Sequence, residues 1–269
     1  MVGKPVAHSL SPVLHGAAYE ALGLPWEYTR LEASASELPA LVADLDESWV
    51  GLSVTMPGKG AALELATSAT DRARAVGAAN TLVRNENGWA ADCTDVDGVA
   101  GALRAAGFET GTSGVVLGAG GTARAALAGL AELGVTSATV VVRDPARAEA
   151  AAACAAAVGL KLEVVAWASA DFPALVAGSS VLVNTAPPDA VGPEALGGTP
   201  FLLDVIYHPW PTPLATAVAE HGGHVATGLD MLLHQAFGQV EQFTGKVAPR
   251  QAMRDALHTA TGGILPLPL

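Results

Sequence analysis

The chain has 269 residues, with 14 Lys plus Arg against 26 Asp plus Glu, and its formal net charge is −12. This acidic balance excludes nucleic acid or an anionic membrane as a general partner, because no basic surface can dominate. A hydrophobic fraction of 51% excludes disorder. Glycine, proline or charge interrupts every apolar run well before the roughly 18 residues of a membrane span. Two cysteines, no zinc-type spacing and no signal-like N-terminus predict a soluble cytoplasmic protein without a metal.

The first hundred residues have an irregular mixture of helical and strand patterns. The predicted helices are residues 11–22 and 36–46, and the predicted strands are 26–31, 50–55, 80–84 and 89–92. The last two strands flank Asn85-Glu-Asn-Gly88, whose Asn-Gly pair favours a β-hairpin. Ser11 followed by Pro12 is typical of a helix N-cap with proline at the first helical position.

From about residue 114, short apolar strands alternate with helices. The predicted strands are residues 114–117, 139–142, 162–165, 181–183 and 202–206, with another around Val225. Helices are expected at 122–133, from Pro145 onward and at 214–220, and the helical tail covers 230–243 and 249–258. This alternation predicts an α/β fold with a Rossmann-like parallel sheet covered on both faces. We expect a first domain of residues 1–97 completed by 229–269, and a second domain of residues 98–228.

A glycine loop follows the first strand of the second domain and precedes a helix. It fits G-x-G-x-x-G/A and consists of Gly118, Ala119, Gly120, Gly121, Thr122 and Ala123. Such a loop turns tightly and directs helix N–H groups at a pyrophosphate, so it predicts a dinucleotide site, although a glycine-rich turn without a ligand is the alternative.

The identity of the dinucleotide depends on the end of the next strand. Arg143 and Arg147 stand there, one helical turn apart, and two guanidinium groups can hold the 2′-phosphate of NADP. Asp144 lies between them and could instead bind the ribose 2′-hydroxyl of NAD. We favour NADP.

Polar residues also interrupt apolar stretches elsewhere in the chain. Ser9 and Ser11 flank Leu10, so their hydroxyls could converge on one polyol ligand. Lys59, one of only four lysines, lies in a Gly/Pro loop just after a strand. The remaining segments of this kind are Gly77-Ala-Ala-Asn80-Thr, Cys93-Thr-Asp95-Val-Asp-Gly98 and Gly228-Leu-Asp-Met-Leu-Leu-His-Gln235.

With these segments in place, the sequence closely resembles the shikimate dehydrogenase family over nearly its whole length. Seven motifs occur in the family's order: G-x-P-x-x-H-S-x-S-P from Gly3, V-T-x-P-x-K from Val54, G-A-x-N-T, T-D-x-x-G, the glycine loop, D-V-I-Y-x-P from Asp204, and G-x-x-M-x-x-x-Q from Gly228. The resemblance implies NADPH-dependent reduction of 3-dehydroshikimate to shikimate, on the route to chorismate and the aromatic amino acids. It also implies a monomer or a homodimer.

The resemblance also implies roles for single residues. Lys59 and Asp95 match the catalytic pair. The residues that match contacts to the substrate are Ser9, Ser11, Thr55, Lys59, Asn80, Asp95, Tyr207 and Gln235. The cofactor would be held by the glycine loop from Gly118 to Ala123, by Arg143 and Arg147, and by Val205 and Gly228 at the nicotinamide.

Several positions depart from the family pattern. Ser53 and Cys93 each replace an asparagine, Gly16 replaces the asparagine after His15, and the segment Asn184-Thr-Ala-Pro-Pro differs from the usual Asn-x-Thr-x-x-Gly. The chain also begins almost at its first glycine, so we expect either a start codon placed downstream of the true one or a missing first strand.

A lysine and an aspartate suit the implied chemistry. Ketone reduction needs a proton for the developing alkoxide, and a lysine ammonium near the carbonyl oxygen can stabilise and protonate it. We expect Lys59 to donate the proton and Asp95 to orient it and bond a substrate hydroxyl. The structural alternatives are an exposed loop lysine at 59 and an Asp95 that caps a helix over residues 96–105. Two rival functions stay open: an NAD-dependent quinate/shikimate dehydrogenase and a non-catalytic regulatory paralogue.

Overall fold

The computed structural model describes residues 1–187, 190 and 198–269, which form two compact units. The first unit comprises Met1–Thr94 with Leu232–Leu267 and Leu269, and the second comprises Asp95–Met231 with Pro268. The predicted two-domain α/β fold is confirmed, while the domain boundaries placed after residues 97 and 228 stay a prediction. In the part of the chain described here, no helix is both long and apolar enough to cross a membrane.

A parallel sheet forms the centre of the second unit. Within the described residues it has six strands in the order β12-β11-β10-β7-β8-β9. These strands are β7 (Ser113–Leu117), β8 (Ser137–Val142), β9 (Lys161–Ala166), β10 (Val181–Asn184), β11 (Phe201–Asp204) and β12 (His224–Thr227). The chain runs outward from β7 to β9, returns to β10 beside β7, and continues outward to β12. Sheets of this order bind ligands outside the carboxyl ends of the strands, at the point where the order reverses.

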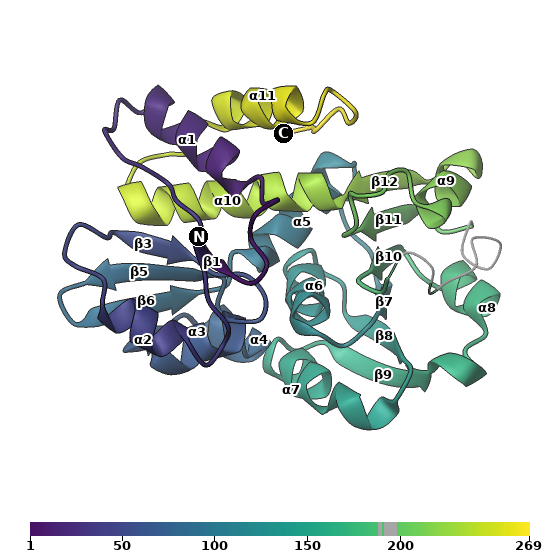
Figure 1. Ribbon diagram of the computed structural model, residues 1–269. Helices are drawn as coiled ribbons and strands as arrows, with labels where there is room; N and C mark the ends of the chain where they lie inside the picture. Colours follow the sequence, from purple (N-terminus) through teal and green to yellow (C-terminus); the bar gives the residue numbers. More distant parts are fainter. Residues whose placement is uncertain (188–189, 191–197) are drawn as a thin grey trace. The chain divides into compact units, whose positions relative to one another are not determined.

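Helices cover both faces of this sheet, with α6 and α7 on one side and α8 and α9 on the other (Figure 1). The helical elements of the unit are α5 (Asp95–Ala105), α6 (Gly121–Glu132), α7 (Glu149–Ala157), α8 (Phe172–Ala177), α9 (Pro213–Glu220) and the short 3₁₀ helices η1 (Pro145–Ala148) and η2 (Trp167–Ser169). Because both faces are covered, the central strands are continuous apolar runs, and Val115, Val116 and Leu117 are all buried.

The first unit contains a smaller mixed sheet with the strand order β3-β5-β6-β4. Its strands are β3 (Gly51–Ser53), β4 (Ser68–Ala69), β5 (Thr81–Asn85) and β6 (Gly88–Asp92). The predicted hairpin joins β5 to β6, with Asn85 opposite Gly88, which takes the positive φ of 119° that glycine tolerates. A short parallel pair, β1 (Val2–Gly3) and β2 (Leu31–Glu32), is joined to this sheet by a bridge between Val2 and Val54.

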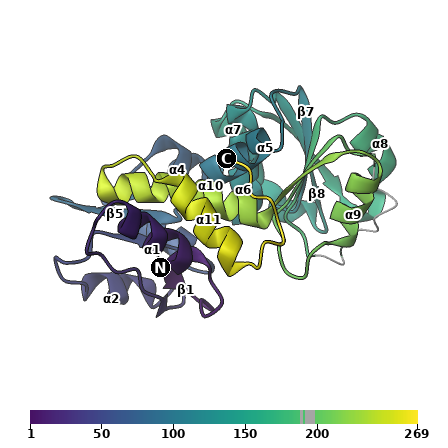
Figure 2. The same ribbon diagram turned by 90° about the horizontal axis from the view of Figure 1, so that it is seen from above.

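Helices enclose the mixed sheet, and α10 lies along one face of it (Figure 1). The helices that contribute to this unit are α1 (Ser11–Ala21), α2 (Leu38–Ala43), α3 (Lys59–Leu65), α4 (Asp71–Val76), α10 (Gly228–Thr244) and α11 (Arg250–Ala260). Figures 1 and 2 both show α1 beside α11. The expectation that the helical tail packs on the first domain is therefore confirmed for α11 and for α10 from Leu232 onward.

Three local predictions were wrong. Of the strand predicted at 26–31 only Leu31 pairs, because its partner β1 is two residues long. The strand predicted to reach Ile206 ends at Asp204, whose carboxylate accepts a hydrogen bond from the Ile206 N–H and turns the chain. Ser11 is the first helical residue rather than the N-cap, and its N–H donates to the Ser9 hydroxyl (3.2 Å).

Candidate active site

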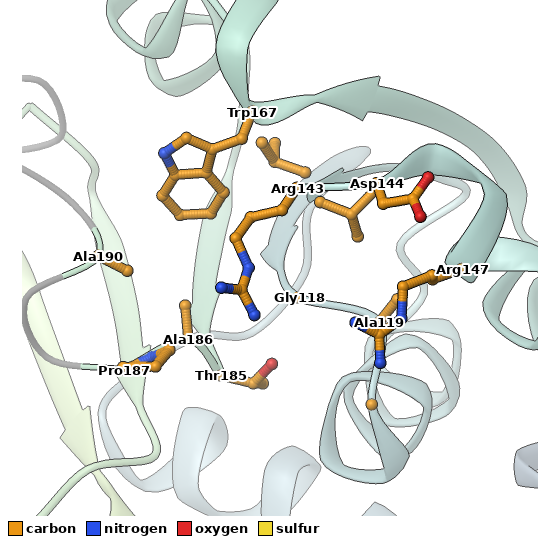
Figure 3. A pocket seen from close by; sticks show the side chains of 13 residues that line it. Gly118, Ala119, Arg143, Asp144, Arg147, Trp167, Thr185, Ala186, Pro187 and Ala190 are labelled. Atoms are coloured by element: carbon orange, nitrogen blue, oxygen red, sulfur yellow. The ribbon is translucent and has the colours of Figure 1, made fainter.

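A pocket of about 610 Å³ opens at the carboxyl ends of the central strands in the second unit (Figure 3). Its walls come from the glycine loop after β7, from the turn after β8, from Trp167 after β9 and from the segment that begins at Thr185 after β10. Part of the segment that departs from the family pattern, Pro188, lies outside the described residues. The pocket therefore occupies the place where a doubly wound sheet binds its ligand.

Two positions of the loop have glycine for different reasons. Gly118 has a φ of +106°, and a Cβ there would lie 2.6 Å from Oγ1 of Thr185, so this position needs glycine for the turn itself. A Cβ on Gly120 would meet no atom within 4 Å. Gly120 is also the N-cap of α6, where no side chain caps the helix. The space in front of the α6 N–H groups is thus open to an approaching phosphate.

Arg143 and Arg147 both line this pocket, as the sequence led us to expect (Figure 3). The guanidinium of Arg143 points into the pocket below Trp167, and that of Arg147 lies near Ala119. The carboxylate of Asp144 points away from the Arg143 guanidinium and accepts a hydrogen bond from the Ala146 N–H (3.1 Å). Two cations and open helix N–H groups fit a phosphorylated dinucleotide.

The residues matched to the nicotinamide end lie together in the same unit. A Cβ added to Gly228 would collide with the carbonyl oxygen of Val205 and would come within 2.9 Å of the Tyr207 ring. Gly228 therefore packs directly on Val205 and beside Tyr207. The segment is supported by Asp204, which accepts hydrogen bonds from Asn184 (3.1 Å) and Thr212 (2.6 Å). Burial raises the pKa of Asp204 above its ordinary value.

Asn80 is the centre of a buried polar cluster in the first unit. Its amide nitrogen donates to Oγ1 of Thr94 (2.9 Å) and to Oε1 of Gln235 (3.2 Å). Its amide oxygen accepts from the Thr94 N–H (2.7 Å) and from the Thr81 hydroxyl (2.9 Å). The structure thus brings two predicted substrate contacts, Asn80 and Gln235, together across 155 residues of sequence.

Both predicted catalytic residues have backbone positions next to residues of this cluster. Lys59 is the first residue of α3, and its carbonyl oxygen accepts a hydrogen bond from the Ala79 N–H (2.9 Å), which places the backbone of Lys59 beside Asn80. Asp95 directly follows Thr94 and is buried at the start of α5. Lys59 belongs to the first unit, and Asp95 is the first residue of the second.

Ser9 and Ser11 converge as predicted, with their hydroxyl oxygens 3.2 Å apart. Arg30 donates to the backbone carbonyl oxygen of Ser9 (2.7 Å), so a cation is held at the same residue. The backbone N–H of Thr55 donates to the carbonyl oxygen of Val2 (2.8 Å), which anchors the loop before Lys59. Hydroxyls and a guanidinium are both suited to binding a carboxylate.

Three residues of these clusters were not predicted from the sequence. They are Arg30, Thr94 and Gln239, whose Nε2 donates to the carbonyl oxygen of Asn80 (2.9 Å). Thr94 lay inside a recognised motif, so its position beside Asp95 was an available signal. Arg30 and Gln239 act across folded elements, and no local pattern marked them. Among the described residues, no group of three His, Cys, Asp or Glu side chains is arranged to hold a metal ion.

Comparisons with known proteins identify the family of this chain. The family model described as the shikimate dehydrogenase substrate binding domain matches residues 1–82, and the model described as the shikimate 5'-dehydrogenase C-terminal domain matches residues 228–258. A relative named shikimate dehydrogenase (NADP(+)), from Methylobacterium radiotolerans, is 42% identical over 91% of this chain and 90% of its own length.

Solved structures give the same result. The structure of Mycobacterium tuberculosis shikimate dehydrogenase is 52% identical, has a TM-score of 0.91 and is matched over 96% of this chain and 97% of that one. Shikimate 5-dehydrogenase from Thermus thermophilus, solved with NADP(H) and shikimate, is 30% identical with a TM-score of 0.84, over 96% of this chain and 97% of that one. The chain therefore belongs to the shikimate dehydrogenase family.

Proposed function

We propose that this protein is an NADP-dependent shikimate dehydrogenase, which reversibly reduces 3-dehydroshikimate to shikimate in the biosynthesis of chorismate and the aromatic amino acids. The observation that carries the proposal is the pairing, in one chain, of an arginine-lined dinucleotide pocket and a buried amide and hydroxyl cluster beside Lys59. Relatives at 42% and 30% identity bear this enzyme's name, and one of them was solved with both ligands.

The lining residues of the nucleotide pocket suit NADP in their charge and in their place at the ends of the strands. The pyrophosphate would be held by the open N-terminus of α6 at Gly120 and Gly121, and the 2′-phosphate by Arg143 and Arg147. Val205 and Gly228 are the residues assigned to the nicotinamide. When bound, NADPH supplies the hydride for the ketone carbon.

The protein's own groups then have to bind the substrate and supply a proton. Ser9 and Ser11 bind the carboxylate, while Thr55, Asn80 and Gln235 bind hydroxyls, and Tyr207 is a further proposed contact. The ammonium of Lys59 bonds the carbonyl oxygen, stabilises the negative charge that develops there, and donates its proton to the alkoxide. Asp95 accepts a hydrogen bond from a substrate hydroxyl and helps to orient the lysine.

The deciding experiment is an assay of NADPH oxidation with 3-dehydroshikimate as the substrate, followed by the reverse reaction with shikimate and NADP⁺. We expect turnover in both directions, and much less turnover with NADH or with quinate. A folded protein that does not oxidise NADPH would contradict the proposal. A strong preference for NADH together with quinate would favour the rival quinate/shikimate dehydrogenase.

A further inference from the structure

A single buried amide lies where three elements of the first unit meet. Gln239 of α10 is 1% exposed. Its Oε1 accepts a hydrogen bond from the Ser53 hydroxyl (2.7 Å) and lies 3.2 Å from Nε2 of His15. Its Nε2 donates to the carbonyl oxygen of Asn80 (2.9 Å) and to the hydroxyl of Thr81 (3.0 Å). Both lone pairs and both N–H groups of the carboxamide are therefore used.

The partners of Gln239 belong to the elements that carry the proposed substrate contacts. His15 is on α1, which begins at Ser11. Ser53 ends β3, two residues before Thr55. Asn80 leads into β5 and is itself a proposed contact. One amide therefore connects α1, the end of β3 and the residue before β5, which are the three segments that carry proposed substrate contacts.

Two further contacts fix the orientation of the His15 ring. The His15 ring stacks on Tyr28 with centroids 4.1 Å apart, and its Nδ1 lies 3.5 Å from the Tyr19 hydroxyl. Because an amide oxygen only accepts hydrogen bonds, Nε2 of His15 carries the proton that points to Gln239. The ring therefore cannot adjust freely if Gln239 is lost.

This arrangement also involves one of the chain's departures from the family pattern. The family pattern has an asparagine at the position of Ser53, whose side chain here is a short hydroxyl. In this chain the amide beside β3 is provided by Gln239 from α10, 186 residues further along the sequence.

We infer that Gln239 is a positioning residue for substrate binding: without touching the substrate, it sets the spacing between the serines at the start of α1, Thr55 after β3, and Asn80 before β5. This role rests on the proposed shikimate dehydrogenase function. It predicts that loss of the Gln239 amide impairs binding of shikimate and leaves binding of NADP⁺ unchanged, because the nucleotide pocket belongs to the second unit.

The test replaces Gln239 with methionine, which has a similar length but no hydrogen bonds. The matched control is Gln242→Met, one turn further along α10, because the Gln242 amide donates to Asp92 at the end of β6 (2.6 Å) and not to the Ser53, His15 and Asn80 group. For each protein, the KM values for shikimate and NADP⁺, the kcat and the melting temperature are measured, and shikimate binding is titrated by calorimetry without cofactor.

For Gln239→Met we expect the KM for shikimate to rise at least tenfold, the KM for NADP⁺ to stay within twofold, and calorimetry to show the same loss of shikimate affinity. The Gln242→Met protein should melt at a lower temperature with both KM values unchanged. A Gln239→Met protein that loses stability but keeps its KM for shikimate, or whose two KM values rise together, would overturn the inference.

A second variant decides the matter if Gln239→Met does not fold. Ser53→Ala removes one hydrogen bond to the Gln239 oxygen and keeps the others, so we expect a rise of several-fold in the KM for shikimate alone. An unchanged KM in Ser53→Ala would then overturn the inference. Failure of the proposed function would be recognised separately, because the unmodified protein itself would show no turnover.

Discussion

The carboxylate of Asp144 accepts a hydrogen bond from the backbone N–H of Ala146, with Oδ1 and N 3.1 Å apart, and so caps the short helix η1. This contact gives Asp144 a structural role between the two arginines of the nucleotide pocket. It removes the main sequence feature that favoured NAD, because a carboxylate that caps a helix and points away from Arg143 is poorly placed for a ribose hydroxyl.

The arginines should determine the choice of cofactor. A hydrogen bond to a charged group contributes about 1.5–3 kcal/mol, so we expect Arg143→Ala to raise the KM for NADPH by about tenfold or more and to change the KM for NADH little. Asp144→Asn keeps the cap but removes a negative charge near the phosphate, and it should improve the use of NADPH. Steady-state kinetics with both cofactors measure this, and a loss of NADH activity in Asp144→Asn would contradict it.

The two glycines of the loop should respond differently to alanine. Gly118→Ala forces a left-handed backbone on alanine and brings its Cβ against Thr185, so we expect a loss of about 1–3 kcal/mol in the free energy of unfolding. Gly120→Ala meets open space, so its unfolding free energy should change by less than about 0.5 kcal/mol.

For Gly120→Ala, the affinity for NADPH should change although the free energy of unfolding does not. The added methyl group of Gly120→Ala lies where the phosphate is proposed to approach the helix, so its affinity for NADPH should fall by at least about tenfold, or about 1.4 kcal/mol. Denaturant unfolding and fluorescence titration measure the two quantities. Full NADPH affinity in Gly120→Ala would show that the loop does not hold the pyrophosphate.

Lys59 should matter for the chemical step. Because a positioned proton donor contributes about 10²–10⁴-fold to the rate, we expect Lys59→Met to lower kcat by that range while NADPH binding is retained. Lys246→Met is the control, since Lys246 is an exposed lysine just beyond α10. Stopped-flow measurement of NADPH oxidation tests this, and near-normal kcat in Lys59→Met would exclude the lysine as proton donor.

His15 should make stability depend on pH. Burial is the main cause that lowers its pKa from 6.5 to about 3. Between these two values the unfolded chain binds a proton that the folded protein does not, so stability falls as the pH falls from 6.5 toward 3. The expected slope from this group is about 1.4 kcal/mol per pH unit.

The variant His15→Gln isolates this contribution, because glutamine cannot gain a proton but retains polar atoms toward Gln239. Urea unfolding of both proteins at pH 7.5, 6 and 5 gives the difference between their pH profiles. We expect the unmodified protein to lose stability more steeply than the variant below pH 6.5. Parallel profiles would show that His15 takes up its proton in the folded state as well.

The sequence by itself determined the features that depend on neighbouring residues. Short apolar strands alternating with helices predicted the parallel sheet, since strands covered on both faces need no polar alternation. The glycine loop and the two arginines one turn apart are local patterns, so this part of the nucleotide pocket could be predicted from the sequence, whereas Trp167 and Thr185 join its wall only in the folded sheet. The convergence of Ser9 and Ser11 likewise required only their spacing.

Only the tertiary structure decided which distant side chains meet. The contacts of Asn80 with Gln235 and of Gln239 with Ser53 join residues 155 and 186 positions apart. They exist because α10 packs on the mixed sheet, and no local propensity encodes which of its amides face that sheet. The same holds for the strand predicted at 26–31, because a strand needs a partner and only the fold determines how much of one is present.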